Sequence, residues 1–117
     1  MIERGAALQL TVIPGFATAT EAFRALRAGA SALKLFPAGT YGPKHVRALR
    51  DVVPRDVALF AVGGVGLGNL AAWFEAGAFG VAIGGELYKP GDSAPTVGLR
   101  ARTLVAAWEA LSATKKQ

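Results

Sequence analysis

The run Ser-Ala-Leu-Lys-Leu-Phe-Pro at residues 31–37 is predicted as a buried β-strand with one charged residue at its centre. Side chains alternate along a strand, so Lys34 and Phe36 lie on one face, and Leu33 and Leu35 on the other. Burying a lysine as an ammonium is costly, and a lysine that has lost its proton is a nucleophile that forms a Schiff base with a ketone. Lys34 is therefore a candidate catalytic residue. The alternative is a lysine at a strand end whose side chain reaches solvent.

Three further apolar runs resemble this strand, and amphipathic helices are predicted between them. The strands are expected at residues 10–13, 58–62 and 80–83, and the helices at about 21–27, 43–53, 69–76 and from about 95 onward. Near-continuous apolar strands separated by such helices are typical of a parallel sheet covered by helices. Their spacing fits the βα units of an α/β barrel, of which eight, in about 250 residues, make a full barrel.

The chain of 117 residues contains four such units, so the sequence predicts an α/β fold that forms half of a TIM (β/α)8 barrel. Residues 2–7 resemble the tail of a helix with no cap and no strand before it. Residues 1–117 are accordingly expected to form one partial barrel domain with a frayed tail at 112–117. An open half barrel would expose its strand edges. A complete small flavodoxin-like sheet is the structural alternative.

Local signals refine the first helix and the segment after the Lys34 strand. Thr18 and Glu21 have the spacing of a capping box, which marks the start of a helix. Phe23 and Leu26 are expected to face inward from that helix. Residues 37–41, which contain Pro37 and Gly39, are predicted as a loop.

Composition excludes several classes of function. There is no cysteine and one histidine, His45, which leaves no thiolate chemistry, no disulfide and no histidine-rich metal site, and fits a cytoplasmic protein. The formal net charge of +5 comes from scattered basic residues without interleaved aromatic side chains, so a nucleic-acid partner is not expected. No apolar run approaches the length that spans a membrane, and no membrane partner is expected.

Two glycine pairs follow consecutive predicted strands, Gly63-Gly64 and Gly84-Gly85. In barrel enzymes the loops after strands 7 and 8 form a phosphate site from backbone N–H groups, and glycine allows the backbone to approach the anion. Two pairs in successive loops, at the same sheet end as Lys34, indicate a phosphate-binding end. The alternative is that both pairs only make tight turns.

Five segments together resemble the 2-keto-3-deoxy-6-phosphogluconate/galactonate aldolases, and the Leu-Lys-Leu-Phe-Pro strand is specific to that family. Within it, Val62 and the stretch Leu-Tyr-Lys-Pro-Gly-Asp-Ser resemble the phosphogalactonate branch more than the phosphogluconate branch. The resemblance covers nearly the whole chain, which would correspond to the C-terminal half of the barrel, strands 5–8. The segments are residues 11–15, 17–23, 32–38, 61–65 and 87–93.

The resemblance implies a class I aldolase that cleaves 2-dehydro-3-deoxy-6-phosphogalactonate to pyruvate and glyceraldehyde 3-phosphate, without metal or organic cofactor. Lys34 would be the Schiff-base lysine, and Pro14, Phe36 and Val62 would line the substrate pocket. The two glycine pairs would hold the phosphate; their residues are Gly63, Gly64, Gly84 and Gly85. The partners implied are a phosphorylated keto-deoxy sugar acid, pyruvate and further copies of the chain in a homo-oligomer.

The sequence also departs from the family pattern. Gly85 stands where the family usually has serine, and Gly66-Leu67-Gly68 replaces a capped, proline-containing helix start. The first four βα units, which in the family hold a proton-shuttling glutamate and a carboxylate-binding arginine, have no counterpart. Glu86 is a candidate replacement base, although a solvated loop carboxylate is the favoured interpretation. An impaired enzyme is expected; the alternatives are an inactive fragment or self-associating half barrel, and the phosphogluconate-specific relative.

Overall fold

The computed structural model describes residues 1–114 and contains one four-stranded sheet in which every neighbouring pair is parallel. The strands lie in chain order, β1-β2-β3-β4. Their bounds are β1 Gly15–Phe16, β2 Ala32–Leu35, β3 Ala58–Val62 and β4 Gly80–Ala82. A sequential parallel order is that of a barrel, whereas a flavodoxin-like sheet has its first two strands interchanged. The half-barrel prediction is confirmed, and the flavodoxin-like alternative is wrong.

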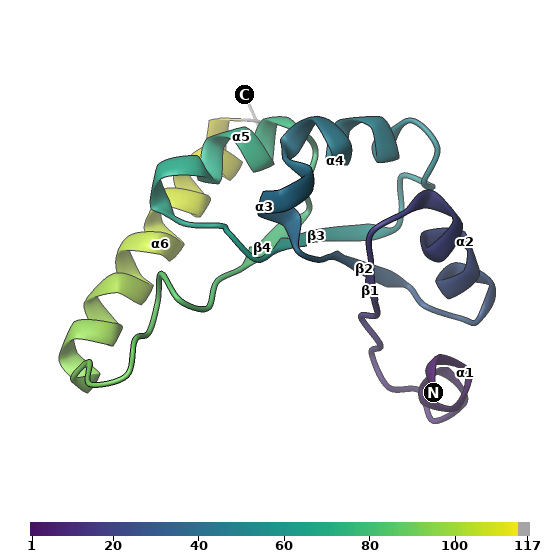
Figure 1. Ribbon diagram of the computed structural model, residues 1–117, viewed down its shortest axis with the longest axis horizontal. Helices are drawn as coiled ribbons and strands as arrows, with labels where there is room; N and C mark the ends of the chain where they lie inside the picture. The colour runs from purple at the N-terminus through teal and green to yellow at the C-terminus, as the bar shows by residue number, and fades with distance from the viewer. Residues whose placement is uncertain (115–117) are drawn as a thin grey trace.

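Helices connect the strands and cover one face of the sheet (Figure 1). In that view α4 and α5 lie above the strands, with α2 at one end and α6 at the other. The helical elements are α1 Ile2–Ala7, α2 Ala19–Arg27, α3 Ala38–Tyr41, α4 Pro43–Arg50, the 3-10 helix η1 Leu67–Asn69, α5 Leu70–Glu75 and α6 Ala94–Thr114.

The hydrophobic core lies between the sheet and these helices. Leu33 and Leu35 of β2 and Leu59 and Ala61 of β3 are completely buried there. The register of β2 with β3 explains why these four residues are buried together. Leu33 pairs with Leu59 and Leu35 pairs with Ala61, so all four side chains lie on the same face of the sheet. Burying each leucine stabilises the fold by about 1.5–3 kcal/mol. Trp73 of α5 closes the core from the helix side and is 1% exposed.

The opposite face of the sheet is open among the described residues. Lys34 pairs with Phe60 of β3, and both side chains are half-buried, as is Val62 two residues further along β3. Phe36 is 54% exposed, although it follows directly on β2. The alternation predicted for the Lys34 strand is confirmed. An apolar face without a covering layer is what half of a barrel presents, because its interior is filled only when the remaining strands close around it.

Several sequence predictions differ from the structure. The strand predicted at 10–13 is wrong: Leu10 and Ile13 are largely exposed, and pairing with β2 begins only at the Pro14 carbonyl. Residues 37–41 are not only a loop, since α3 forms there. Phe23 does not face inward, because the small residues Ala22 and Ala25 occupy the contact with the core. The helix predicted at 43–53, which is α4, ends at Arg50, earlier than predicted.

The last helix, α6, packs beside the sheet rather than into its core. None of its described residues is fully buried, but Leu104, Ala107, Trp108 and Leu111 pack against the core. The Trp108 ring meets the Phe74 ring of α5 edge-on, with ring centres 5.5 Å apart. It continues through Thr114, past residue 112 where fraying was predicted; residues 115–117 of that tail lie outside the described part. Among residues 1–114, no helix combines the length and the apolar character needed to cross a membrane.

Candidate functional site

Lys34 lies near the carboxyl end of β2, on the open face of the sheet. Its backbone is held by β1 and the residue before it, since the Lys34 N–H donates to the Pro14 carbonyl at 2.9 Å and Gly15 is its register partner. A side chain on Gly15 would meet the Lys34 Cε at 3.5 Å, so the lysine stem passes directly over that glycine. The Lys34 Nζ lies 5.9 Å from the centre of the Phe36 ring, within the range of a cation–π contact.

A small cavity of about 250 Å³ surrounds this lysine, and we call it the Lys34 pocket. It lies between β2 and the segment that runs from β1 into α2. Its lining residues are Gly15, Phe16, Ala17, Glu21, Lys34 and Phe36.

The structure brings two of the predicted pocket residues together and leaves two outside. Lys34 and Phe36 line the Lys34 pocket. Pro14 binds the Lys34 backbone but lines a neighbouring cavity between α1 and α2. Val62 lies on the same face as Lys34, one strand away, without lining this pocket. Their roles toward a substrate stay predictions.

The first glycine pair follows β3 and contacts the Lys34 strand. Gly63 has φ +91° and Gly64 φ +71°, backbone conformations that side-chain-bearing residues rarely adopt. A side chain on Gly63 would meet the Phe36 ring at 3.1 Å, and one on Gly64 would meet the Cα of Gly39 at 3.1 Å. The Gly39 N–H donates to the Gly63 carbonyl at 2.8 Å. Close packing of two loops therefore requires both glycines.

The second glycine pair follows β4 and is free of such constraints. A side chain on Gly84 or on Gly85 would meet no atom within 4 Å, and neither residue has a positive φ among the described backbone angles. Both pairs follow the carboxyl ends of parallel strands, so both lie at the sheet end that carries Lys34. The lysine and both glycine loops therefore lie at the same end of the sheet, as expected. Phosphate binding there stays a prediction.

The candidate base Glu86 and the capping residue Glu21 line two different cavities. Glu86 packs over Gly66, where a side chain would come within 2.9 Å of the Glu86 Cγ, and it lines a cavity against α6 rather than the Lys34 pocket. Glu21 lines the Lys34 pocket, but its Oε2 accepts hydrogen bonds from the N–H groups of Ala17 and Thr18, both at 2.9 Å. These bonds, the Ala17 one foremost, lower the pKa of the Glu21 carboxyl below its usual range.

Two side chains that sequence reasoning missed hold the loops of this end in place. The Asn69 Oδ1 accepts from the Gly66 N–H at 3.0 Å, and its Nδ2 donates to the Gly64 carbonyl at 2.9 Å. The Asn69 side chain thus satisfies the Gly66 N–H at the start of η1, although it makes no cap hydrogen bond to α5. His45 of α4 reaches back 28 residues to the Ala17 carbonyl, and no local pattern could have predicted that contact.

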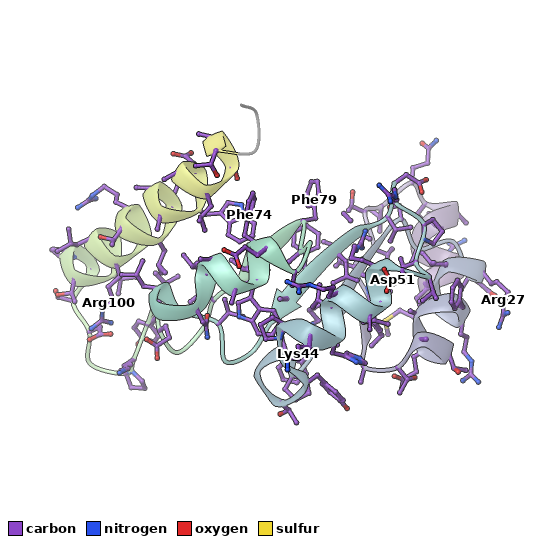
Figure 2. The ribbon with its side chains drawn as sticks, turned by 90° about the horizontal axis from the view of Figure 1, so that it is seen from above. Arg27, Lys44, Asp51, Phe74, Phe79 and Arg100 are labelled. Atoms are coloured by element: carbon purple, nitrogen blue, oxygen red, sulfur yellow. The ribbon has the colours of Figure 1, made fainter. Side chains whose placement is uncertain are left out.

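Charged groups are spread over the surface rather than gathered at the site. Arg27, Lys44 and Arg100 belong to α2, α4 and α6 and lie well apart (Figure 2). Within residues 1–114, no group of three or more histidine, cysteine, aspartate or glutamate side chains is placed to hold a metal ion. The Lys34 amine and two glycine-containing loops lie at this end of the sheet, and their chemical role stays a prediction.

Comparison with known proteins gives this arrangement a context. The chain is 48% identical over 108 residues to the 2-dehydro-3-deoxy-6-phosphogalactonate aldolase of Escherichia coli (strain K12), which covers 92% of this chain and 53% of the relative. It is 42% identical over 111 residues to a probable enzyme of the same name from Rhizobium meliloti (strain 1021), covering 95% of this chain and 52% of the relative. The chain thus spans about half the length of the curated relatives it matches.

Solved structures agree with the fold. The structure described as native KDPGal superposes with a TM-score of 0.91 at 47% identity, over 95% of this chain and 54% of the other. A cube-shaped cage designed by fusing symmetric oligomeric domains superposes with a TM-score of 0.94 at 46% identity, over 99% of this chain and 43% of the other. The family model for KDPG and KHG aldolase matches residues 1–94. The chain belongs to the KDPG and KHG aldolase family, a family of lyases.

Proposed function

We propose that this chain carries the Schiff-base half of a class I aldolase that cleaves 2-dehydro-3-deoxy-6-phosphogalactonate to pyruvate and glyceraldehyde 3-phosphate. The observation that carries the proposal is the position of Lys34. The residue is half-buried on the open face, with its Nζ 5.9 Å from the Phe36 ring centre, at the sheet end where two glycine loops follow β3 and β4. The identity of 48% to an aldolase named for that substrate supports the choice of sugar acid.

The reaction needs one amine, one base and water. The neutral Lys34 amine attacks the C2 ketone, and loss of water gives an iminium. A base removes the proton of the C4 hydroxyl, the C3–C4 bond breaks, and its electron pair moves into the iminium to give an enamine and the free aldehyde. The enamine then takes a proton at C3, and water hydrolyses the resulting iminium to release pyruvate and restore the amine.

The rest of the proposed site divides between the two ends of the substrate. Phe36, whose ring centre lies 5.9 Å from the Lys34 Nζ, supplies an apolar wall for the pyruvate moiety, with Pro14 just before β1 and Val62 on β3. The phosphate is assigned to the loops at Gly63-Gly64 and Gly84-Gly85, whose backbone N–H groups suit an anion.

We propose a single partial barrel domain and, given the absence of cysteine, a cytoplasmic location.

Turnover by the 117-residue chain is proposed to be weak. Neither the proton-shuttling glutamate nor the carboxylate-binding arginine expected from the family has a counterpart here. Glu21 is committed to two backbone N–H groups, and Glu86 packs away from the Lys34 pocket. Positioned acid–base groups contribute about 10²–10⁴-fold to such reactions, and orientation contributes another large factor. We expect turnover at least about a thousandfold below that of a full-length relative.

A steady-state assay that couples pyruvate release to lactate dehydrogenase tests this proposal. Weak but measurable release from the phosphogalactonate substrate, absent in Lys34→Ala, is the expected result. The phosphogluconate epimer, offered in parallel, decides between the two branches of the family. Release that persists in Lys34→Ala would contradict the proposal, and turnover near that of a full-length relative would contradict the predicted impairment.

A second candidate function, self-association of half barrels, is favoured by the free edge of β4. Phe79 is 68% exposed beside that edge and packs edge-on against Phe60 at 5.5 Å. An apolar groove of about 480 Å³ runs there between β4 and α6. Unpaired strand edges and apolar grooves promote association between chains. Analytical ultracentrifugation should show a concentration-dependent homo-oligomer that Phe79→Ser weakens, and a monomer at all concentrations would contradict this candidate.

A further inference from the structure

Residues 16–18 lead from β1 into α2, and Phe16 and Ala17 of this segment line the Lys34 pocket. In the segment's two consecutive peptide units, Phe16-Ala17 and Ala17-Thr18, each N–H and each C=O group has a hydrogen-bond partner. The Phe16 carbonyl accepts from the Phe36 N–H at 3.0 Å, and the Ala17 N–H donates to Glu21. The Ala17 carbonyl accepts from the His45 Nε2 at 2.7 Å, and the Thr18 N–H donates to Glu21.

His45 supplies the contact that comes from furthest away in the sequence. The other bonds to this segment come from β2, which pairs with it, and from the capping residue of its own helix. His45 belongs to α4 and is half-buried. Its ring stacks on Tyr41 of α3 with centroids 5.0 Å apart and planes 28° apart, which fixes the direction of Nε2. Because a carbonyl can only accept, Nε2 carries the proton in this contact.

We propose that His45 and Glu21 are positioning residues that hold the Ala17–Thr18 peptide from both ends and so set the wall that faces Lys34. This inference rests on the proposed function and adds two residues to it. Neither side chain is proposed to touch the reacting atoms. A peptide unit released at its carbonyl could rotate, and the wall would then no longer oppose the substrate carbons at a fixed distance from the lysine.

Four variants separate this role from a general loss of stability. His45→Phe keeps a ring that stacks on Tyr41 and removes the donor, whereas His45→Gln keeps an N–H donor of comparable reach. Arg47→Gln changes an exposed side chain of the same helix, for which no hydrogen bond is present among the described residues, and serves as the matched control. Glu21→Ala removes the acceptor of both N–H groups.

Two measurements are made on each variant: the amide exchange rates of Ala17 and Thr18 by NMR, and the pyruvate concentration that half-saturates borohydride trapping on Lys34. In His45→Phe we expect faster Thr18 exchange and a half-saturating concentration raised about fivefold, as the loss of one hydrogen bond predicts. Glu21→Ala should raise the half-saturating pyruvate concentration at least as much. His45→Gln should stay within about twofold of the wild type, and Arg47→Gln should not differ from it.

The outcomes distinguish this inference from the proposed function. Unchanged amide exchange in a folded His45→Phe would overturn the positioning role whatever the trapping shows. Equal losses in His45→Gln and His45→Phe would also overturn it, because the donor would then not be what matters. Trapping that fails in the wild type would contradict the proposed function itself.

Discussion

The two glycine pairs look alike in the sequence and differ in what the structure requires of them. At Gly63-Gly64 the backbone is left-handed, and neighbouring atoms stand 3.1 Å from where a side chain would begin. At Gly84-Gly85 the surrounding space is open. Packing therefore accounts for the first pair, whereas no contact within residues 1–114 demands glycine at the second. A motif shared by two loops can have two causes, and ligand binding is the better candidate where packing gives no reason.

The largest effect that separates the two loops is expected in stability. Gly64→Ala places a side chain at φ +71° against the backbone of Gly39, which cannot move aside easily. We expect a loss of about 1–3 kcal/mol in the free energy of unfolding. Gly84→Ala, the matched control, should change it by less than about 0.5 kcal/mol. Urea unfolding followed by circular dichroism measures both, and equal losses would abolish the distinction.

The next largest effect is expected in the affinity for phosphate, and it should appear at the Gly84-Gly85 loop. A larger side chain there keeps the backbone N–H groups away from an anion, so Gly84→Val should raise the dissociation constant for glycerol 3-phosphate about tenfold. Stability should be unchanged. An NMR titration of the amide signals gives the constant. An unchanged constant would leave Gly84-Gly85 without a role.

How far the sequence predicted these features depends on whether the cause is local. The run at 58–62 became β3 with its predicted bounds, and Thr18 with Glu21 formed the predicted capping box. Leu10 and Ile13 have strand-like character but pair with no strand among residues 1–114, and without such pairing their propensity did not give a strand. The contact of His45 with Ala17 depends on how two distant helices pack, which no local pattern contains.

In the candidate site, sequence reasoning placed Lys34 and the four glycines at one end of the sheet, because parallel strands share that end. It could not tell the two glycine loops apart, since the difference lies in Phe36 and Gly39, which approach only one of them. It also did not predict that Glu21 lines the Lys34 pocket.

A smaller effect is expected from Asn69, which bridges only the first loop. Asn69→Ala removes hydrogen bonds to the Gly66 N–H and the Gly64 carbonyl, and should cost about 1 kcal/mol of unfolding free energy. Asn69→Asp keeps an acceptor for Gly66 and loses the donor, so its cost should be lower. Thermal unfolding ranks the three proteins. A more stable alanine variant would show that the bridge does not stabilise the loop.

The smallest expected effect is a pH dependence of stability. It concerns Asp92, in the segment that runs from the second glycine pair to α6. The side-chain hydrogen bond from Arg100, foremost, and a hydrogen bond from the Lys89 N–H lower the pKa of the Asp92 carboxyl below its ordinary value. A depressed pKa stabilises the fold above the unfolded pKa of about 3.9, and this contribution is lost as pH falls through the folded value. The Tm advantage of the wild type over Asp92→Asn should therefore shrink below about pH 4.

Asp56→Asn is the control for this measurement, because Asp56 is exposed and has no hydrogen bond or ion pair among the described residues. Its difference from the wild type should not follow the same course with pH. A Tm difference for Asp92→Asn that is constant from pH 7 to about pH 3 would exclude the ion pair as the anchor of this loop.

The central claim is that Lys34 is the amine that binds the keto acid, and the site of covalent trapping tests it most directly. The chain should be incubated with pyruvate, reduced with borohydride and mapped by mass spectrometry of its peptides. Lys44 and Lys89, both exposed, are internal controls in the same molecule. We predict a reduced pyruvyl group on Lys34 at pyruvate concentrations that leave Lys44 and Lys89 unmodified, and none at that position in Lys34→Ala. Equal modification of all three lysines, or none on Lys34 in a folded sample, would contradict the account.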